Sequence, residues 1–322
     1  MTTEQTSSAR ALSDGLAAAV DRVAAATVLV SARRHIPGTG VAWGADGLIV
    51  TADHVIETED DITVGLPDGR EAQAQLVGRD PSSDLALLRV EGAGLTAAAI
   101  APAGSAKVGN LVLAVGRPTR GGPQASLGVV SAVGGSQGAS RMFGRGHGGS
   151  QIEGYLRTDI TFFPGFSGGP LVDVDGQVVG LNVSLIGGPR MFRFARQAFG
   201  QGFTIDAASV TKVVELLQTH GRVRRAYIGI ASQPVQLPES LAAEFPDQAT
   251  GLLIVNIEAD TPAAAAGLLV GDILVGIEGA PIRDAEDLQQ ALGPERVGVA
   301  VRLQLIRGGV RHELSVTLGV RD

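Results

Sequence analysis

Short apolar runs separated by glycine-containing turns recur along the first part of the chain, and this feature limits the possible fold most strongly. The runs include TVLVSA, GLIVTA, DITVGL, LALLRV, LVLAVG and LGVVSAV, with a turn signal about every ten residues. This spacing favours an all-β sandwich or barrel. Glycine supplies 45 of the 322 residues, which indicates many turns and short strands rather than long helices. We therefore expect a mainly β fold.

A change of pattern near residue 207 indicates a second domain. The run AASVTKVVELLQTHG places apolar residues three and four positions apart, as in an amphipathic helix, and Gly221 ends it. A charged connector and a new block of strands follow. A chain of this length is long enough for two domains. We predict an N-terminal arm at 1–24, one domain at 25–218, a linker at 219–226 and a second domain at 227–322.

The second block contains signals for two short helices. Thr261 is a good N-cap and Pro262 follows it at the first helical position. A further helix is expected from Asp284 to Gly293. In the first domain, the glycine- and serine-rich segment 134–154 lacks apolar periodicity, so we predict a long mobile loop there.

Composition excludes several classes of function. The net charge of −7, without a basic cluster, argues against nucleic-acid partners. The absence of cysteine excludes disulfides, thiol catalysis and zinc–thiolate sites, and we expect no cofactor or metal. No phosphate loop of the form GxxxxGK[ST] is present, which favours independence from ATP.

The N-terminal sequence bears on localisation. It starts MTTEQTSSAR and lacks a basic region followed by an apolar run, as an export signal would have. The apolar stretch 16–32 carries Asp21 and Arg22 and is too short to span a bilayer. We therefore expect no membrane span and a cytoplasmic location for the chain as written.

One serine lies among glycines in FFPGFSGGPLVD, residues 162–173. This run could be only a tight turn between strands, or Ser167 could be a nucleophile whose backbone the glycines shape. A serine hydroxyl needs a base to become nucleophilic. Among five histidines, His54 stands out because it follows an apolar strand in GLIVTADHVIE. Asp84, which begins the strand DLALLRV, is the candidate to orient the imidazole, with turn capping as its alternative role.

The order of these three residues along the chain is informative. His54 precedes Asp84 by 30 residues, and Asp84 precedes Ser167 by 83 residues. The order His, Asp, Ser is that of the chymotrypsin-type double β-barrel, and it differs from the orders in subtilisin and in α/β-hydrolases. In this architecture the histidine and aspartate come from the first barrel and the serine from the second.

Four motifs resemble those of a known family. GFSGGPLVD closely resembles the GxSGGP motif of trypsin-fold serine proteases. TADHVI and SDLALLRV resemble the histidine and aspartate motifs of the HtrA (Deg) subfamily, and GFTIDAASVTKVVELLQTHGRVRRAYIGI resembles its junction between protease and PDZ domains. The resemblance covers about residues 25–320. It implies a chymotrypsin-like double β-barrel followed by an α+β PDZ domain, in a serine endopeptidase for unfolded or damaged proteins that serves protein quality control and the stress response.

The resemblance also implies an oxyanion hole built from the backbone N–H groups of Gly165 and Ser167. The chain departs from the family at Phe166, where trypsin-type enzymes have aspartate and HtrA proteins usually have asparagine. That aspartate pairs with a freed N-terminus in zymogen activation. Phenylalanine cannot do so, and we expect no activation of that kind. The backbone donors survive this substitution, but the sequence does not show what holds the loop in register. A catalytically inactive scaffold that binds peptides is therefore the alternative function, and an esterase is a third.

Substrate contacts are assigned by position in the motif. In trypsin-type enzymes the base of the S1 pocket lies six residues before the nucleophile, which is Thr161 here. A neutral residue there argues against lysine or arginine selectivity, and we expect small to medium aliphatic residues at P1. The strand expected to pair with the substrate backbone contains Gly180, Leu181, Asn182 and Val183.

The second domain resembles a PDZ module. Its loop Tyr227-Ile228-Gly229-Ile230 resembles the carboxylate-binding loop, and a C-terminal peptide would add as a strand beside Ile230. Leu288 and Leu292 would line the other wall of the groove, although both could simply fill the core. The family resemblance further implies a homo-oligomer, commonly a trimer, and a location outside the cytoplasm. The latter conflicts with the missing export signal.

Overall fold

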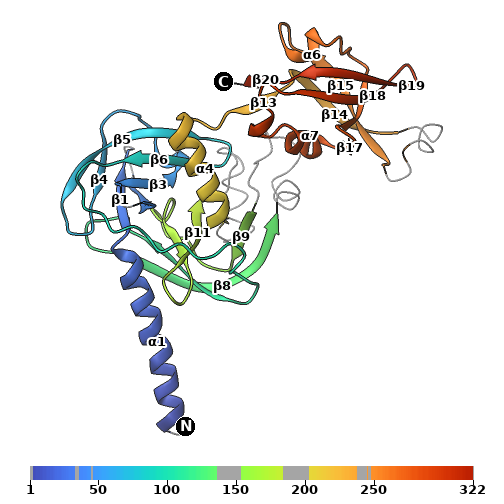
Figure 1. The fold of residues 1–322 in the computed structure, drawn as a ribbon. Coiled ribbons are helices and arrows are strands. Elements are labelled where there is room, and N and C mark those ends of the chain that lie inside the picture. The colour runs from blue at the N-terminus through green and yellow to red at the C-terminus, as the bar shows by residue number, and fades with distance from the viewer. Residues whose placement is uncertain are drawn as a thin grey trace. The chain divides into compact units, whose positions relative to one another are not determined.

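The computed structural model describes residues 3–32, 36–44, 46–135, 154–183, 203–237, 245 and 248–321 (Figure 1). The chain divides into two compact units, Met1–Val223 and Arg224–Asp322. The division falls within the expected linker 219–226, although the preceding helix extends to His220. Apart from its ends, the predicted loop 134–154 lies outside the described residues.

The first barrel carries one half of the expected site. It is a closed barrel in the order β1-β2-β3-β6-β5-β4. Every residue of β2 and β3 is buried, because these short runs are flanked by neighbours on both sides. Burying a large aliphatic side chain contributes about 1.5–3 kcal/mol, and Ile49, Leu87 and Leu88 are among the fully buried ones. The strands are β1 (Thr27–Ser31), β2 (Gly38–Ala42), β3 (Leu48–Ala52), β4 (Ile62–Gly65), β5 (Glu71–Asp80) and β6 (Leu85–Arg89).

The second barrel carries the serine. It closes in the order β10-β11-β12-β9-β8-β7, and its own apolar cluster includes Ile160, Phe166 and Leu171. All residues of β10 and β11 are buried. The strands are β7 (Leu111–Gly116), β8 (Gln124–Gly135), β9 (Gly154–Thr158), β10 (Pro170–Val172), β11 (Val178–Val183) and β12 (Phe203–Asp206).

Two helices complete the first unit. The predicted arm is helix α1 (Thr3–Ala24), which packs Ala19 and Val23 on the second barrel and extends away from it toward the N-terminus (Figure 1). Helix α4 (Ala207–His220) follows β12 and packs against β5, β6 and β11. As predicted, Gly221 ends α4, with φ of +69° and its N–H bonded to a carbonyl of the last turn.

The second unit is a small α+β domain. Its main sheet has the order β14-β15-β16-β18-β19, with β17 paired to β16, and β13 pairs with β20. The strands are β13 (Arg225–Tyr227), β14 (Ile230–Gln236), β15 (Thr250–Ile257), β16 (Ile273–Ile277), β17 (Ala280–Pro281), β18 (Ala300–Arg307), β19 (Val310–Thr317) and β20 (Gly319–Arg321). The helices are α6 (Pro262–Ala265), α7 (Ala285–Ala291) and the 3-10 turn η2 (Pro294–Arg296). Thr261 caps α6 as predicted, with its Oγ1 accepting from the N–H of Ala264 at 3.5 Å.

The architecture confirms the mainly β prediction with two barrels followed by a PDZ-like sheet domain. Within the described ranges, no helix is both long and apolar enough to cross a membrane.

Candidate active site

The first barrel brings His54 and Asp84 together at one end of two neighbouring strands. β3 and β6 are antiparallel, with Ala52 opposite Leu85, so the end of β3 meets the start of β6. His54 lies in the 3-10 turn η1 (Asp53–Val55) directly after β3, and Asp84 lies directly before β6. The backbone N–H of His54 donates to Oδ1 of Asp84 at 2.9 Å. This strand register explains how residues 30 apart in sequence become neighbours.

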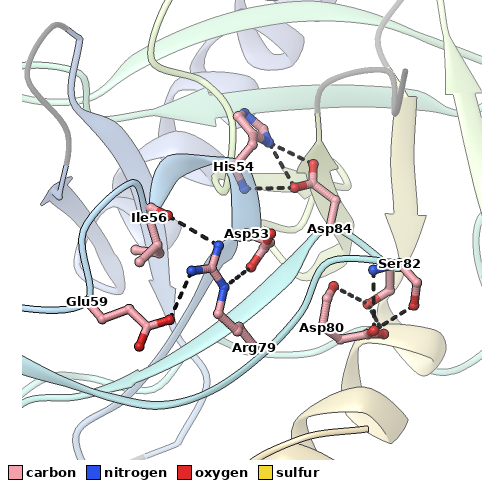
Figure 2. Close-up of polar contacts among 9 residues, drawn as sticks. Asp53, His54, Ile56, Glu59, Arg79, Asp80, Ser82 and Asp84 are labelled. Carbon is pink, nitrogen blue, oxygen red and sulfur yellow. Dashed lines mark hydrogen bonds and ion pairs between the residues drawn. The ribbon is translucent and has the colours of Figure 1, made fainter. Parts of the chain in front are cut away.

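The imidazole and the carboxylate are in direct contact (Figure 2). Nδ1 of His54 lies 2.9 Å from Oδ1 and 2.8 Å from Oδ2 of Asp84. An ionised carboxylate can only accept hydrogen bonds, so the nitrogen facing it carries the proton and Nε2 is left as the basic nitrogen. The Asp84 side chain is 8% exposed and that of His54 32% exposed. The arrangement therefore offers an imidazole that the carboxylate holds in place and whose side chain remains partly exposed.

A charged cluster supports the turn that carries His54 (Figure 2). Nε of Arg79 donates to Oδ1 of Asp53 at 2.6 Å, and its other nitrogens donate to Glu59 at 3.2 Å and to the Ile56 carbonyl at 3.3 Å. The hydrogen bond with Asp53 is the main cause that raises the pKa of Arg79, and burial opposes it. The guanidinium thus ties both ends of η1 to β5.

Asp80, the other acidic residue of the RDPSSD run, has a local role. Its Oδ1 accepts from the hydroxyl of Ser82 at 2.6 Å (Figure 2). Its Oδ2 accepts from the hydroxyl of Ser83 at 2.7 Å. This is turn chemistry of the kind that aspartate commonly provides. The structure therefore separates a turn-forming carboxylate from the one beside the imidazole.

Ser167 follows a turn that rests on the first barrel. Its carbonyl accepts from the N–H of Thr39 in β2 at 2.9 Å. The next residue, Gly168, has φ of +82°, and a Cβ there would lie 2.4 Å from Oγ1 of Thr51 and 2.9 Å from the nitrogen of Ala52. Gly168 is therefore in close contact with the end of β3, two residues before His54. Because Gly168 has no side chain, the residues around Ser167 pack closely against the end of β3, which leads to His54.

Residues 163–166, directly before Ser167, have the features of a type II β-turn, and we call them the oxyanion turn after the role predicted for Gly165 and Ser167. The N–H of Phe166 donates to the carbonyl of Phe163 at 3.1 Å, Pro164 occupies the second position, and Gly165 has φ of +88° at the third. A type II turn needs a positive φ at this third position. A Cβ on Gly165 would also lie 2.5 Å from Cβ of Pro118. Both backbone angle and space therefore require glycine.

The strand predicted to pair with substrate is already paired along most of its length. β11 lies between β10 and β12. Gly180 and Leu181 pair with both of these strands, whereas Asn182 pairs with β12 on one side and bonds the segment after Ser167 on the other. The N–H of Asn182 donates to Gly169 at 2.8 Å and its carbonyl accepts from Gly168 at 2.7 Å. The prediction that Gly180, Leu181 and Asn182 bind the substrate backbone is therefore wrong. Val183, the last residue of β11, extends beyond the described pairing with β10.

Thr161 lies on the approach to the oxyanion turn. It is exposed in the segment between β9 and Ser167, as a residue that meets substrate would be. The side chain is neutral, so it offers no counter-charge for lysine or arginine.

The predicted peptide-binding loop of the second unit lies between β13 and β14. The carbonyl of Ile228 accepts from the N–H of Ala263 at 2.8 Å, and that of Gly229 accepts from the N–H of Glu258 at 3.0 Å. Gly229 has φ of +90°, and a Cβ there would lie 2.3 Å from Cβ of Thr261. Contacts inside the domain therefore already require glycine at position 229, whether or not a ligand approaches the loop there.

The other predicted groove residues are divided between surface and core. Tyr227 donates its hydroxyl to Glu258, and Ile230, at the start of β14, packs against the core while remaining partly exposed. Leu288 is 7% exposed and belongs to the core, and Leu292 is half-buried against it. Helix α7, which carries Leu288, contacts β14.

Comparisons with known proteins agree with this fold. A trypsin-like peptidase domain model matches residues 38–181 and a PDZ domain model matches residues 226–318. The crystal structure of the serine endoprotease from Yersinia pestis has a TM-score of 0.75 and 30% identity, covering 94% of this chain and 97% of that one. The HtrA-type protease AlgW with tripeptide has a TM-score of 0.76 and 30% identity, covering 95% and 97%.

The chain belongs to the HtrA family of serine proteases.

Curated relatives of this HtrA protein extend further than the chain does. It is 35% identical over 283 residues to a probable periplasmic serine endoprotease, DegP-like, of Ectopseudomonas mendocina, covering 88% of this chain and 56% of the relative. A protein of the same description from Halomonas elongata is 32% identical, with 90% and 57% covered. The chain thus spans little more than half the length of these relatives.

Sequence reasoning missed two residues that support the oxyanion turn of this HtrA protein. Oγ1 of Thr39 donates to the carbonyl of Gly165 at 2.6 Å, and the backbone N–H of Arg117 donates to Oγ1 of Thr39 at 2.8 Å. Nothing in the runs GTGVA and GRPT distinguishes these residues from ordinary strand ends. The dipeptide Pro164-Gly165, in contrast, was a readable type II turn signal.

Proposed function

We propose that this chain is an ATP-independent serine endopeptidase that cleaves unfolded or damaged proteins, with a PDZ domain that recruits or regulates through C-terminal peptides. The observation that carries the proposal is the contact between Nδ1 of His54 and both carboxylate oxygens of Asp84. The positive φ of Gly165, two residues before the serine, supports it further. Family membership favours the same activity over an inactive scaffold.

In this proposal Ser167 attacks the scissile carbonyl carbon. As the Oγ–C bond forms, Nε2 of His54 takes the hydroxyl proton, and the carboxylate of Asp84 stabilises the resulting imidazolium. When the C–N bond breaks, the imidazolium gives this proton to the leaving amine. Water then attacks the ester by the same sequence, with His54 again as base, and releases Ser167.

The oxyanion turn supplies the second element of catalysis. The N–H groups of Gly165 and Ser167 donate to the oxygen of the tetrahedral intermediate, where charge develops. Removing one such donor typically costs about 2.7–4 kcal/mol of transition-state stabilisation. Because backbone groups provide these hydrogen bonds, Phe166 can replace the usual polar residue without removing a donor.

A fluorophosphonate probe tests the activity directly. We expect it to label the wild-type chain, and Ser167→Ala to abolish both labelling and casein cleavage. Ser105→Ala, which alters an exposed turn far along the chain from the serine motif, should leave both unchanged. If the folded wild-type chain is neither labelled nor cleaves casein, the scaffold alternative replaces this proposal. Hydrolysis of small esters without any cleavage of peptides would favour the esterase.

The substrate preference follows from Thr161 and Val183. A neutral, exposed Thr161 favours valine and similar aliphatic residues at P1, and Val183 is where the substrate backbone would approach β11. We expect a peptide series that varies only at P1 to give a higher kcat/KM for valine than for lysine. A preference for lysine would exclude this assignment.

The PDZ assignment rests on the edge of a sheet. β14 is the terminal strand of the described sheet order, and α7 contacts it, as β-augmentation between a strand and a helix requires. The residues proposed to bind peptide are Tyr227, Ile228, Gly229, Ile230, Leu288 and Leu292. A fluorescent peptide with a free C-terminal carboxylate should bind the chain more tightly than its carboxamide. Equal affinity would contradict capture of the carboxylate.

The same proposal places the protein outside the cytoplasm. The expectation of a cytoplasmic location is not supported, because curated relatives are named as periplasmic proteases. Fractionation of cells that express the full natural gene would test this location. A trimer stays a prediction, which mass photometry of the purified chain can check.

A further inference from the structure

The side chain of Phe166, directly before the candidate nucleophile Ser167, is fully buried. It is 0% exposed and lies in the apolar cluster of the second barrel. Its ring meets that of Phe163 edge to face, with centroids 5.4 Å apart. A Cβ on Gly116 would lie 2.5 Å from Cδ1 of Phe166. The ring therefore occupies a space that exists only because residue 116 has no side chain.

A hydroxyl group holds the same turn from the other side. Oγ1 of Thr39 accepts from the N–H of Arg117 at 2.8 Å and donates to the carbonyl of Gly165 at 2.6 Å. Because the Arg117 N–H occupies a lone pair of the hydroxyl oxygen, the hydroxyl hydrogen is directed toward Gly165. Thr39 is 0% exposed, so water does not compete for this bond.

Both contacts involve residues at the end of β7. Gly116 makes room for the Phe166 ring, and the next residue, Arg117, orients the Thr39 hydroxyl. The Arg117 side chain is itself buried and fixed, with Nε donating to the carbonyl of Thr27 at 2.7 Å and Nη2 to that of Ala24 at 3.1 Å. The turn is thus held at residue 165 by a hydrogen bond and at residue 166 by apolar packing.

We propose that Thr39 and Phe166 are positioning residues, which hold the oxyanion turn so that Gly165 and Ser167 present their N–H groups to the substrate oxygen. This inference rests on the proposed function.

The decisive variants are Thr39→Val and Thr39→Ser. Valine has nearly the same shape but no hydroxyl, whereas serine keeps it. We expect Thr39→Val to lower kcat between about 10-fold and 10³-fold, up to the loss caused by removing one oxyanion donor, with a much smaller change in KM. The affinity for a peptide boronate, which forms a tetrahedral adduct with the serine, should fall in step with kcat. Thr39→Ser should restore both.

A matched control separates positioning from general destabilisation. Thr211 in α4 also donates its hydroxyl to a backbone carbonyl, that of Ala207 at 2.9 Å, but it belongs to another element. Thr211→Val should leave kcat and boronate affinity unchanged. If it lowers kcat as much as Thr39→Val does, the effect of Thr39 is merely structural and the inference is wrong.

The contribution of Phe166 is tested with Phe166→Asn and Phe166→Leu. We expect asparagine to lower kcat more than leucine does, because the apolar space over Gly116 suits a hydrophobic side chain. If Phe166→Asn fails to fold, Phe166→Leu and the Thr39 pair decide the matter. Wild-type kcat in both Thr39→Val and Phe166→Leu would overturn the inference while leaving the proposed function intact. Absence of labelling in the wild type would overturn the proposed function itself.

Discussion

The two barrels position their halves of the candidate site by different physical means. The first barrel uses charge: the Asp84 carboxylate contacts Nδ1 of His54, and the ion pair between Arg79 and Asp53 secures the turn beneath it. The second barrel uses backbone geometry and apolar burial around Gly165 and Phe166. The difference follows from what each half must do.

In the proposed mechanism, the imidazole carries a proton and the oxyanion turn presents backbone donors, and these two roles need different support. The imidazole must keep one tautomer and tolerate a positive charge, and only a fixed carboxylate provides both. The oxyanion turn must keep N–H groups pointing at one place, which a tight turn with a buried anchor can achieve without any charge. If this comparison holds, charge-neutralising substitutions should affect catalysis in the first barrel, and volume or backbone substitutions should affect it in the second.

The largest effect is expected for Asp84→Asn. The amide NH₂ would face Nδ1 of His54 and favour the tautomer with the proton on Nε2, which cannot accept from Ser167. We expect kcat to fall about 10⁴-fold, measured with a chromogenic peptide. Asp84 has φ of +56°, a conformation that asparagine tolerates, so the thermal midpoint should change little. A loss of activity below tenfold would contradict the role of the carboxylate.

The next effect tests the second barrel with Gly165→Ala. The added Cβ would meet Pro118 and the carbonyl of Pro37 at a φ of +88°, so the turn must move. We expect kcat to fall about 10²–10³-fold, as when one oxyanion donor is lost.

Gly69 offers a control for backbone strain alone. It also has φ of +88°, but a Cβ there meets nothing within 4 Å. Gly69→Ala should therefore cost about 1–2 kcal/mol of stability from the left-handed conformation and leave kcat unchanged. Equal losses of activity in both variants would mean that strain, rather than displacement of the turn, is responsible.

The sequence predicted the charged half of the site better than the apolar half. His54 and Asp84 lie at the ends of runs whose strand character is local and readable, and antiparallel pairing brings those ends together. Thr39 lies 126 residues from the glycine it bonds, and no local pattern predicts such a contact. The burial of Phe166 depends on the absence of a side chain at Gly116, and no local sequence pattern predicts that contact either.

The wrong assignment of β11 has the same origin. The run VVGLNV predicts a buried strand correctly, but it does not say which of its edges are paired. Both edges are occupied along residues 180–182 because β10 and β12 lie on either side. The turn spacing predicted a mainly β fold but left a sandwich and a barrel open. The double barrel was indicated by the order His, Asp, Ser and by the family resemblance.

The comparison can be extended to the second unit, where a buried charge has a structural role. Asp272 is 1% exposed and accepts from Nε and Nη2 of Arg307, each at 2.8 Å. Burial raises the pKa of Asp272, but the hydrogen bonds from Arg307 and the Leu269 N–H outweigh it and leave the pKa below its ordinary value. Asp272→Asn should lower the free energy of unfolding by about 1.5–3 kcal/mol, with activity on small peptides unchanged.

The pH dependence of this effect has a definite sign. A carboxylate with a lowered pKa in the folded state stabilises the fold above its ordinary pKa, near 3.8, and this contribution is lost as the pH falls through the lowered value. Urea unfolding of wild type and Asp272→Asn should therefore differ at pH 7 and converge as the pH falls below about 4. A constant difference down to pH 2.5 would mean that the ion pair is not the cause.

The smallest effect concerns the charged support beneath His54, where Asp53→Asn keeps one acceptor for Arg79 but removes its charge. The Asp53 side chain is 11% exposed, while that of Glu59, bound to the same guanidinium, is 63% exposed. We expect Asp53→Asn to lower the free energy of urea unfolding by about 1 kcal/mol, and Glu59→Gln to change it by about 0.5 kcal/mol or less because water screens an exposed pair. Because η1 carries His54, Asp53→Asn should also reduce kcat slightly, whereas Glu59→Gln should not. If Asp53→Asn and Glu59→Gln lowered the free energy of unfolding equally, the buried carboxylate of Asp53 would not be what holds Arg79. Within the described part of the chain, Asp84 would then be the only charged group that supports the imidazole.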